Sequence, residues 1–162
     1  MATVHPGRYS ARVDRPVVVF AIGMRLNRPH AVHRWWRPML NTVRMWRHVQ
    51  GRRPTGYLGG YLFVYWCGVG MIQYWEDVDQ LVAFSHDSTQ PHLAAWHQLA
   101  ALTRTDSTFG YWHETYQVAP GTSEAIYGSM PRFGLAAATA HEPIRGATES
   151  AHARLALGEE SA

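Results

Sequence analysis

The segment Phe109–Gly134 contains the residues of this chain whose types and spacing are best suited to chemistry. It opens with an alternating aromatic and polar run in which His113, Glu114 and Tyr116 can each exchange or donate a proton. Because successive side chains of a strand point to opposite faces, His113 lies on one face and Glu114 and Tyr116 lie on the other. At least one face therefore meets more than an apolar core, and we expect a functional site here.

His113 is the first candidate for a catalytic residue. In largely apolar surroundings we expect a neutral imidazole, which would act as a base toward a phenol or an enol. The alternative is that His113 is a hydrogen-bonded structural residue and that Glu114 pairs with an arginine of the first helix. The sequence alone supports both interpretations.

A second group of candidates lies on a predicted hairpin and consists of Trp66, Gln73 and Tyr74. A reaction with a developing oxyanion needs a pocket that excludes water and hydrogen-bond donors that stabilise the negative charge. Tyrosine and tryptophan supply apolar area with one donor each, so we predict catalytic roles for Tyr74 and Trp66 and substrate contact for Gln73. The alternative is plain packing at a dimer interface.

Other kinds of site lack their sequence patterns. The ten histidines do not form zinc-ligand spacings, so we expect no metal site. No Gly-x-Gly-x-x-Gly follows a strand and no serine nucleophile elbow occurs, which argues against a dinucleotide site and a serine hydrolase.

The elements that must position these residues follow the order β-α-β-β-α-β, which predicts an α+β fold of the ferredoxin-like type. Pro38 lies inside the first helical pattern and is expected to kink that helix or divide it in two. Asp77 is a predicted helix N-cap with Gln80 three residues later. The expected elements are a strand at Val17–Met24, a helix at Val32–Val49, a hairpin of Tyr57–Trp66 and Met71–Trp75 around Gly68-Val-Gly70, a helix ending near His86, a helix starting near Pro91 and a strand at Phe109–Val118.

The first predicted helix has a wide apolar stripe, which we expect to face the core, with arginines on the other side. The stripe comprises Val32, Trp35, Trp36, Met39, Leu40, Val43, Trp46 and Val49.

Helices on one face of a four-stranded sheet leave the second face uncovered. Here we expect that face to be aromatic and to consist of Tyr57, Tyr61, Phe63, Tyr65 or their alternates. An exposed face of that kind needs a partner, so we predict a homodimer in which two sheets pair as a dimeric α/β barrel.

The chain is expected to form one domain over residues 1–138, followed by a tail at 139–162 that is rich in Ala, Glu and Ser and is expected to be mobile or weakly helical. Within the domain, Glu124–Leu135 is predicted to be either a lid over the barrel or an arm swapped between subunits.

Charge and cysteine content bear on partners and compartment. Residues 1–53 contain eleven arginines and one acidic residue, and the rest contains four arginines and eleven acidic residues. We interpret this as a basic helix face that meets the acidic half of the same fold or of a partner subunit, and we expect no nucleic-acid partner.

The uncharged run Tyr57–Trp75 is better interpreted as strands than as a membrane span, so no membrane partner is expected. A single cysteine, Cys67, and the absence of an apolar leader favour the cytoplasm.

Several motifs resemble a known family. They are Ile72-Gln-Tyr-Trp75, a following helix with His92 and Trp96, Trp112-His-Glu-Thr-Tyr116, Glu124-Ala-Ile-Tyr-Gly128, Met130-Pro131 and Phe133-Gly134-Leu135. Together they resemble a bacterial monooxygenase-like family that is similar to the fumagillin-pathway monooxygenase. That family belongs to the dimeric α/β-barrel superfamily, with the antibiotic-biosynthesis monooxygenases, and the resemblance covers residues 5 to about 138.

The resemblance implies an oxidoreductase that acts on a hydrophobic aromatic, polyketide or terpenoid molecule without flavin, metal or haem. Other branches of the superfamily bind haem, and His92 or His86 would then be the axial ligand. A third alternative is a non-catalytic stress barrel that binds a small molecule. The residues expected to contact substrate are Gln73, Trp96, Tyr116, Tyr127, Met130 and Phe133.

Overall fold

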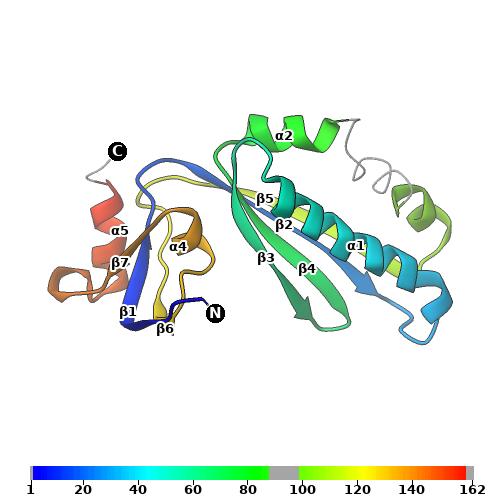
Figure 1. The fold of residues 1–162 in the computed structure, drawn as a ribbon, viewed down its shortest axis with the longest axis horizontal. Helices are drawn as coiled ribbons and strands as arrows, with labels where there is room; N and C mark the ends of the chain where they lie inside the picture. Colours follow the sequence, from blue (N-terminus) through cyan, green and yellow to red (C-terminus); the bar gives the residue numbers. More distant parts are fainter. Residues whose placement is uncertain (1, 88–98, 160–162) are drawn as a thin grey trace.

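The structure, a computed structural model, describes residues 2–87 and 99–159. Two antiparallel sheets lie side by side along the long axis of the molecule, as Figure 1 shows. The larger sheet has the strand order β3-β4-β2-β5 and the smaller one the order β6-β1-β7. The larger sheet consists of β2 (Val17–Leu26), β3 (Tyr57–Tyr65), β4 (Gly68–Trp75) and β5 (Phe109–Val118), and the smaller one of β1 (His5–Arg12), β6 (Tyr127–Met130) and β7 (Ala140–Pro143).

Two helices, α1 (Val32–Arg52) and α2 (Val78–His86), cover one face of the larger sheet (Figure 1). Residues 99–105 are also helical and precede β5. The order β2-α1-β3-β4-α2-β5, with β2 between β4 and β5, is the ferredoxin-like arrangement. The predicted α+β ferredoxin-like fold is therefore confirmed.

The strand β2 owes its central position to a continuous apolar and β-branched run. Val17, Val18 and Met24 are almost fully buried, as expected for a strand with neighbours on both edges. The bounds predicted for β5 also agree with the structure. Asp77 caps α2 as predicted, since its carboxylate accepts a hydrogen bond of 2.7 Å from the backbone N–H of Gln80.

The helix α1 runs unbroken through Pro38, so the expected division into two helices does not occur. Proline removes one backbone donor, and a single missing bond is tolerated in a helix of 21 residues whose packing holds it in place. The expectation for its apolar stripe is wrong in part. Val32, Trp36 and Leu40 are 51%, 42% and 43% exposed, because other residues of α1 meet the sheet.

The β3–β4 hairpin turns at Trp66 and Cys67, two residues earlier than predicted. Cys67 has a φ of 49° and is exposed. Gly68 and Gly70 lie in β4, where a Cβ would come within 2.7 Å of the Tyr65 ring and 2.5 Å of the Phe63 ring, respectively. Gly70 therefore leaves room for the Phe63 ring, and Gly68 leaves room for the Tyr65 ring and for the backbone carbonyl oxygen of Met24, which would lie 2.5 Å from an added Cβ.

The core lies between the larger sheet and the two helices. Trp75 is fully buried at its centre, and its ring meets Tyr57 and Phe84 with centroid separations of 5.3 and 5.2 Å. Val18, Val49 and Leu81 complete the cluster. Among the described residues, no helix is both long and apolar enough to span a bilayer.

The opposite face of the larger sheet is aromatic, and among the described residues it is met only at one end, by the short helix at 135–138 and the segment before it. Tyr61, Phe63 and Tyr65 form a row along β3, and Trp112 of β5 donates a 2.6 Å hydrogen bond from Nε1 to the Tyr65 hydroxyl. Phe133 lies against Tyr61 with a centroid separation of 4.3 Å. We call this surface the open face. The prediction of an aromatic second face is confirmed for three of its four residues, because the irregular pairing between Tyr57 and Gly59 leaves Tyr57 on the helix side.

The smaller sheet brings the two ends of the chain together. Strand β1 pairs with β6 on one side and with β7 on the other. The segment predicted as a mobile tail contains β7, the short helix η1 (Gly146–Thr148) and α5 (Ala151–Glu159). The Arg154 guanidinium, 6% exposed, pairs with Glu124 and so connects α5 to the loop before β6. The helix α4 (Leu135–Ala138) contacts both β1 and β3.

Charge pairing follows the asymmetry of the sequence. Of the five ion pairs among the described residues, four join an arginine of the first 53 residues to an acidic residue further along the chain. They are Arg8–Glu149, Arg12–Glu142, Arg15–Glu76 and Arg34–Asp106. This supports pairing within the fold as one use of the basic N-terminal region.

Gly60 of β3 is expected to tolerate no side chain. A Cβ there would lie 2.4 Å from the carbonyl oxygen of Ile72, a backbone atom of the paired strand, and 2.8 Å from the Tyr57 hydroxyl. Because that backbone cannot shift without breaking the β3–β4 ladder, Gly60→Ala should lower the free energy of unfolding by about 1–3 kcal/mol. The control is Gly128→Ala in β6, where nothing lies within 4 Å of the added Cβ. Equal urea midpoints for the two variants would contradict the prediction.

Candidate active site

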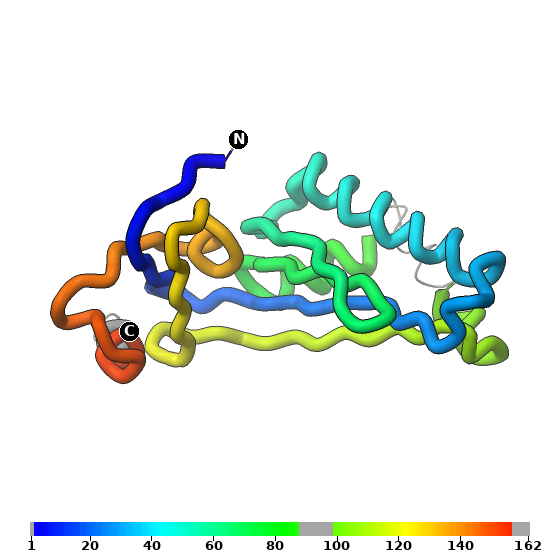
Figure 2. Tube along the Cα trace, turned by 90° about the horizontal axis from the view of Figure 1, so that it is seen from below, coloured from blue at the N-terminus to red at the C-terminus, as the bar shows by residue number. Residues whose placement is uncertain are grey.

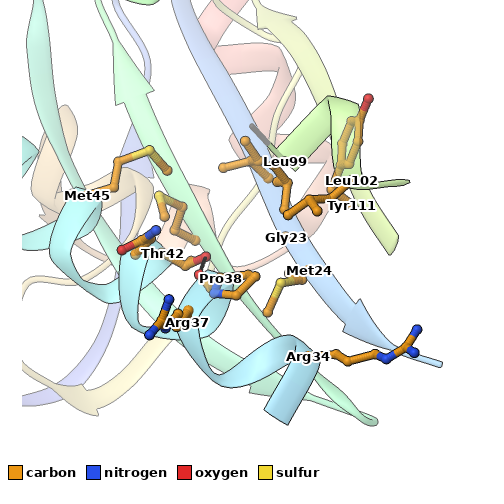
Figure 3. A pocket seen from close by; sticks show the side chains of 13 residues that line it. Gly23, Met24, Arg34, Arg37, Pro38, Thr42, Met45, Leu99, Leu102 and Tyr111 are labelled. Carbon is orange, nitrogen blue, oxygen red and sulfur yellow. Dashed lines mark hydrogen bonds between the residues drawn. The ribbon is translucent and has the colours of Figure 1, made fainter. Parts of the chain in front are cut away.

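A cavity of about 230 Å³ lies between α1 and the helix-covered face of the larger sheet (Figure 3). Its floor comes from β2, β4 and β5, and its walls come from α1 and from the helical residues 99–105. The residues that line it are Ile22, Gly23, Met24, Arg34, Arg37, Pro38, Asn41, Thr42, Met45, Met71, Leu99, Leu102 and Tyr111. We call it the α1 pocket.

On α1 the pocket lining combines three short side chains with the longer Arg34, Arg37 and Met45. Pro38, Asn41 and Thr42 lie on the side of the helix that faces the floor, while Trp36 and Leu40 lie outside. The floor is closed by Met24 and Met71, which are 2% and 1% exposed. Apolar walls with a few polar groups are typical of a site for a small hydrophobic molecule.

An ion pair connects two walls of the α1 pocket. The Arg34 guanidinium lies 3.2 Å from Asp106, which follows the helical residues 99–105. Hydrogen bonding from Thr108, together with the charge of Arg34, lowers the pKa of the Asp106 carboxyl below its ordinary value. The charged form of Asp106 is therefore favoured by folding.

Asp106→Asn is expected to reduce the sensitivity of the fold to acid. A carboxyl whose pKa is lowered by folding stabilises the protein above its unfolded pKa of about 3.9, and that contribution is lost as the pH falls through its folded pKa. The difference in Tm between wild type and variant should therefore be present at neutral pH and shrink below about pH 4. Asp14→Asn, at the exposed β1–β2 connection, is the control. A Tm difference that stays constant with pH would contradict the proposed stabilisation by the charged form of Asp106.

His113 lies on the same side of the sheet as the α1 pocket, but it is exposed and is not among the described residues that line the pocket, so the expected apolar surroundings are not found. It pairs in register with Ile22 of β2, and its ring lies 5.7 Å from that of Phe20. Tyr111, two residues earlier on β5, lines the pocket, so His113 is about 7 Å further along the strand. Glu114 and Tyr116 lie on the open face, where the Tyr116 hydroxyl donates a 2.5 Å hydrogen bond to Glu114. The predicted separation of these residues between two faces is confirmed.

The structure does not bring His113, Tyr74 and Trp66 together within one chain. Tyr74 is 7% exposed on the opposite face of the sheet from His113. Burial raises the pKa of its hydroxyl well above the ordinary value, with Tyr61 and Tyr127 nearby adding to the effect. Trp66 is 72% exposed at the hairpin turn, with the Arg25 guanidinium 4.1 Å above its ring.

Gln73 is buried on the helix-covered face, but its hydrogen bonds are made to neighbours within the core. Its Oε1 accepts from Trp75 Nε1 at 3.0 Å, and its Nε2 lies 3.0 Å from the Met71 sulfur. Gln73 therefore holds the floor of the α1 pocket through Met71, and it is not among the residues that line the pocket.

The predicted lid, Glu124–Leu135, folds back toward the open face. Tyr127 is buried in β6, and its hydroxyl accepts a 3.4 Å hydrogen bond from the Ala136 N–H. Met130 ends β6 and is 37% exposed, while Phe133 packs on Tyr61. In this arrangement the segment covers one end of the open face and lies on the other side of the sheet from the α1 pocket.

The remaining candidates concern the second helix of the motif and a haem ligand. Trp96 and His92 lie outside the described residues. His86 is exposed at the end of α2, where its Nδ1 lies 2.9 Å from the carbonyl oxygen of Val82. No cluster of three or more His, Cys, Asp or Glu suited to a metal ion occurs in the part of the chain that the structure describes.

Sequence reasoning missed the residues of α1 that line the pocket. Pro38, Thr42 and Met45 follow one another at steps of four and three, which is the spacing of one helix face. That signal was present, but the larger and more apolar stripe through Trp36 and Leu40 masked it.

Solved structures of other proteins share the fold. An aldoxime dehydratase (OxdRE), solved in complex with butyraldoxime, has a TM-score of 0.60 and 18% identity; the match covers 98% of this chain and 45% of that chain. This chain thus spans less than half of the dehydratase. Looser matches, with TM-scores of 0.38 and 0.40, are SnoaB, a cofactor-independent oxygenase from Streptomyces nogalater, and a dimeric ferredoxin-like protein from an uncultured marine organism. SnoaB is 15% identical, and the match covers 63% of this chain and 92% of SnoaB. The dimeric ferredoxin-like protein is 14% identical, and the match covers 64% of this chain and 95% of that chain.

Sequence comparison gives the family. No curated protein matches the chain. Residues 17–135 match the family described as monooxygenase af470-like, and this range runs from the first strand of the larger sheet to the start of α4. The match covers well over half of the chain, so the protein belongs to the monooxygenase af470-like family.

Proposed function

We propose that this protein is a monooxygenase-like enzyme that acts, without flavin, metal or haem, on a hydrophobic small molecule with an aromatic, polyketide or terpenoid skeleton. The observation that carries the proposal is the α1 pocket, an apolar cavity in a member of a monooxygenase-like family. Its floor of Ile22, Met24 and Met71 suits a flat or compact apolar molecule.

His113 is the proposed base of this reaction. It would remove a proton from a phenol or enol, and the resulting anion would transfer one electron to O₂. Recombination of the substrate radical with superoxide forms a carbon–oxygen bond, and the hydroperoxide then loses water to leave a carbonyl. One oxygen atom enters the product, the other leaves as water, and the substrate supplies all the electrons. Exclusion of water by the apolar walls protects the intermediates.

The partner that we propose for the open face is a second copy of the chain. The row Tyr61, Phe63 and Tyr65 is aromatic and lies on the side of the sheet away from the helices. Pairing two such faces buries them and gives the dimeric α/β barrel. Light scattering should then give twice the mass of the chain, and a monomer at micromolar concentration would contradict the dimer. In the dimer the partner's open face would also cover Tyr116, which is 53% exposed, and that is the setting in which its predicted substrate contact would apply; Tyr74 is already buried within one chain.

Haem fits the described residues poorly. An axial histidine would have to enter the cavity, and among the described residues that line the α1 pocket there is no histidine. His86 lies outside that lining, and its Nδ1 is already close to a backbone carbonyl.

The first experiment is an absorption spectrum of the purified protein, as isolated and during titration with haemin. We expect no saturable haemin binding and, in a second step, oxygen uptake with phenolic or enolic polycyclic substrates. A sharp Soret band at unit stoichiometry that is lost in His86→Ala or His92→Ala would overturn the cofactor-free proposal. Stoichiometric ligand binding without oxygen consumption would instead indicate a non-catalytic carrier.

A further inference from the structure

The side of α1 that faces away from the sheet carries an exposed apolar line. Val32, Trp36 and Leu40 are spaced four residues apart, which places them one above the other on the helix surface. Their exposed fractions are 51%, 42% and 43%. These fractions place the line on the outside of α1, which itself lies at the periphery of the molecule (Figure 2).

Positive charge without compensating acid surrounds this line. The whole of α1 contains no Asp or Glu, and Arg37, Arg44 and Arg47 are exposed. Among the described residues, only Arg34 of the α1 arginines takes part in an ion pair. Residues 88–98 contain no acidic residue in sequence. We call the surface formed by Val32, Trp36, Leu40, Arg44 and Arg47 the outward face of α1; Arg37 lies at its edge, since it also lines the α1 pocket.

We propose that the outward face of α1 binds an anionic lipid surface, with the helix lying in the plane of the headgroups. Apolar side chains with a tryptophan insert at the level where lipid headgroups meet acyl chains, and arginines beside them bind lipid phosphates. The guanidinium of Arg37 already lies 5.3 Å from the Trp36 ring centroid, so the charged and the apolar components are adjacent. The proposal concerns attachment to a membrane surface, and it does not depend on the oxygenase proposal.

Charge argues against a second copy as the occupant of this face. In a symmetric dimer the same patch meets itself, so pairing two outward faces would bring like charges together in the absence of any acid on α1. The open face offers an uncharged row of aromatic side chains for self-association instead. It lies on the other side of the sheet, so a dimer formed there leaves α1 accessible.

Side-chain type argues for lipid over nucleic acid. A single-stranded nucleic acid would use arginines and stacking aromatics, and Trp36 is the one aromatic residue of the outward face. Val32 and Leu40 have no role in base stacking, whereas a bilayer interface takes up aliphatic side chains with a gain in free energy. The sequence predicts strands and no membrane span in Tyr57–Trp75, and it predicts that the apolar stripe of α1 faces the core. The structure exposes part of that stripe beside the arginines.

The test is co-sedimentation of the full chain with vesicles of phosphatidylcholine alone and of phosphatidylcholine mixed with phosphatidylglycerol. We expect binding to the mixed vesicles only, weakening as salt is raised. The double variant Arg44→Gln/Arg47→Gln should bind about 30-fold more weakly at low ionic strength. Trp36→Ser should bind the mixed vesicles about tenfold more weakly. The matched controls are Arg145→Gln and Trp66→Ser, which remove an exposed arginine and an exposed tryptophan elsewhere.

The proposal would be overturned by three results. The first is the absence of sedimentation with mixed vesicles at low salt. The second is binding that the Trp66 and Arg145 variants reduce as much as the α1 variants do. The third is a salt-dependent complex with single-stranded DNA and none with vesicles. Brominated lipids should quench tryptophan emission in wild type and Trp66→Ser, and this quenching should be lost in Trp36→Ser, which reports insertion of Trp36 itself.

Discussion

His113→Ala is expected to lower turnover of an identified substrate by about 100-fold or more, the usual contribution of a positioned general base. The reason is that the imidazole lies on the same side of the sheet as the α1 pocket, beside Ile22 and two residues along β5 from Tyr111, next to the residues that line the pocket. The substitution removes no large apolar contact, because His113 is exposed, so the fold and ligand binding in the pocket should persist. Oxygen uptake and product formation measure the effect.

Two controls distinguish proton transfer from a structural role of His113. His152→Ala removes an exposed histidine of α5, far along the chain from the pocket, and should leave turnover unchanged. Added imidazole should restore part of the activity of His113→Ala if a base is missing, and it should restore none if the strand is distorted. Turnover within a factor of about three of wild type would exclude His113 as the base.

Trp75→Ala is expected to cause the largest loss of stability, about 3–5 kcal/mol in the free energy of unfolding. The Trp75 side chain is fully buried and lies between Tyr57 and Phe84 at the centre of the core. Its removal leaves a cavity and also deprives Gln73 Oε1 of its 3.0 Å hydrogen bond. Since whole domains are stable by about 5–15 kcal/mol, the variant should be largely unfolded at moderate urea.

The matched control for Trp75 is Trp66→Ala. Trp66 is 72% exposed at the β3–β4 turn, and its main contact is the Arg25 guanidinium. A cation–π contact at an exposed site contributes about 0.5–1 kcal/mol, so Trp66→Ala should lower the free energy of unfolding by no more than that. Urea unfolding followed by circular dichroism separates the two variants. Similar midpoints would mean that the core is not centred on Trp75.

The open face and the α1 pocket divide the predicted site residues into two groups. His113 and Gln73 are on the helix-covered side, and Tyr74, Tyr116 and Phe133 are on the other. Strand alternation on β5 separated His113 from Tyr116 in the sequence alone. The placement of Tyr74 required the register of β4 on β2, in which Tyr74 pairs with Val19 and Gln73 pairs with Phe20. Register depends on contacts between strands that are about 50 residues apart, so neither strand specifies it.

Local sequence determined the order of the main elements, the bounds of β5 and the cap of α2, because hydrophobic periodicity and capping depend on a few neighbouring residues. It also determined that a second, aromatic face exists on the larger sheet. Tertiary structure decided the pairing of β1 with β7, which joins residues that are more than 120 positions apart. Above all, it decided which side of α1 meets the sheet. The most apolar stripe predicts burial, but the rotation of a helix on a sheet follows from the shape of both surfaces, and short side chains at Pro38 and Thr42 leave the pocket open while Trp36 stays outside.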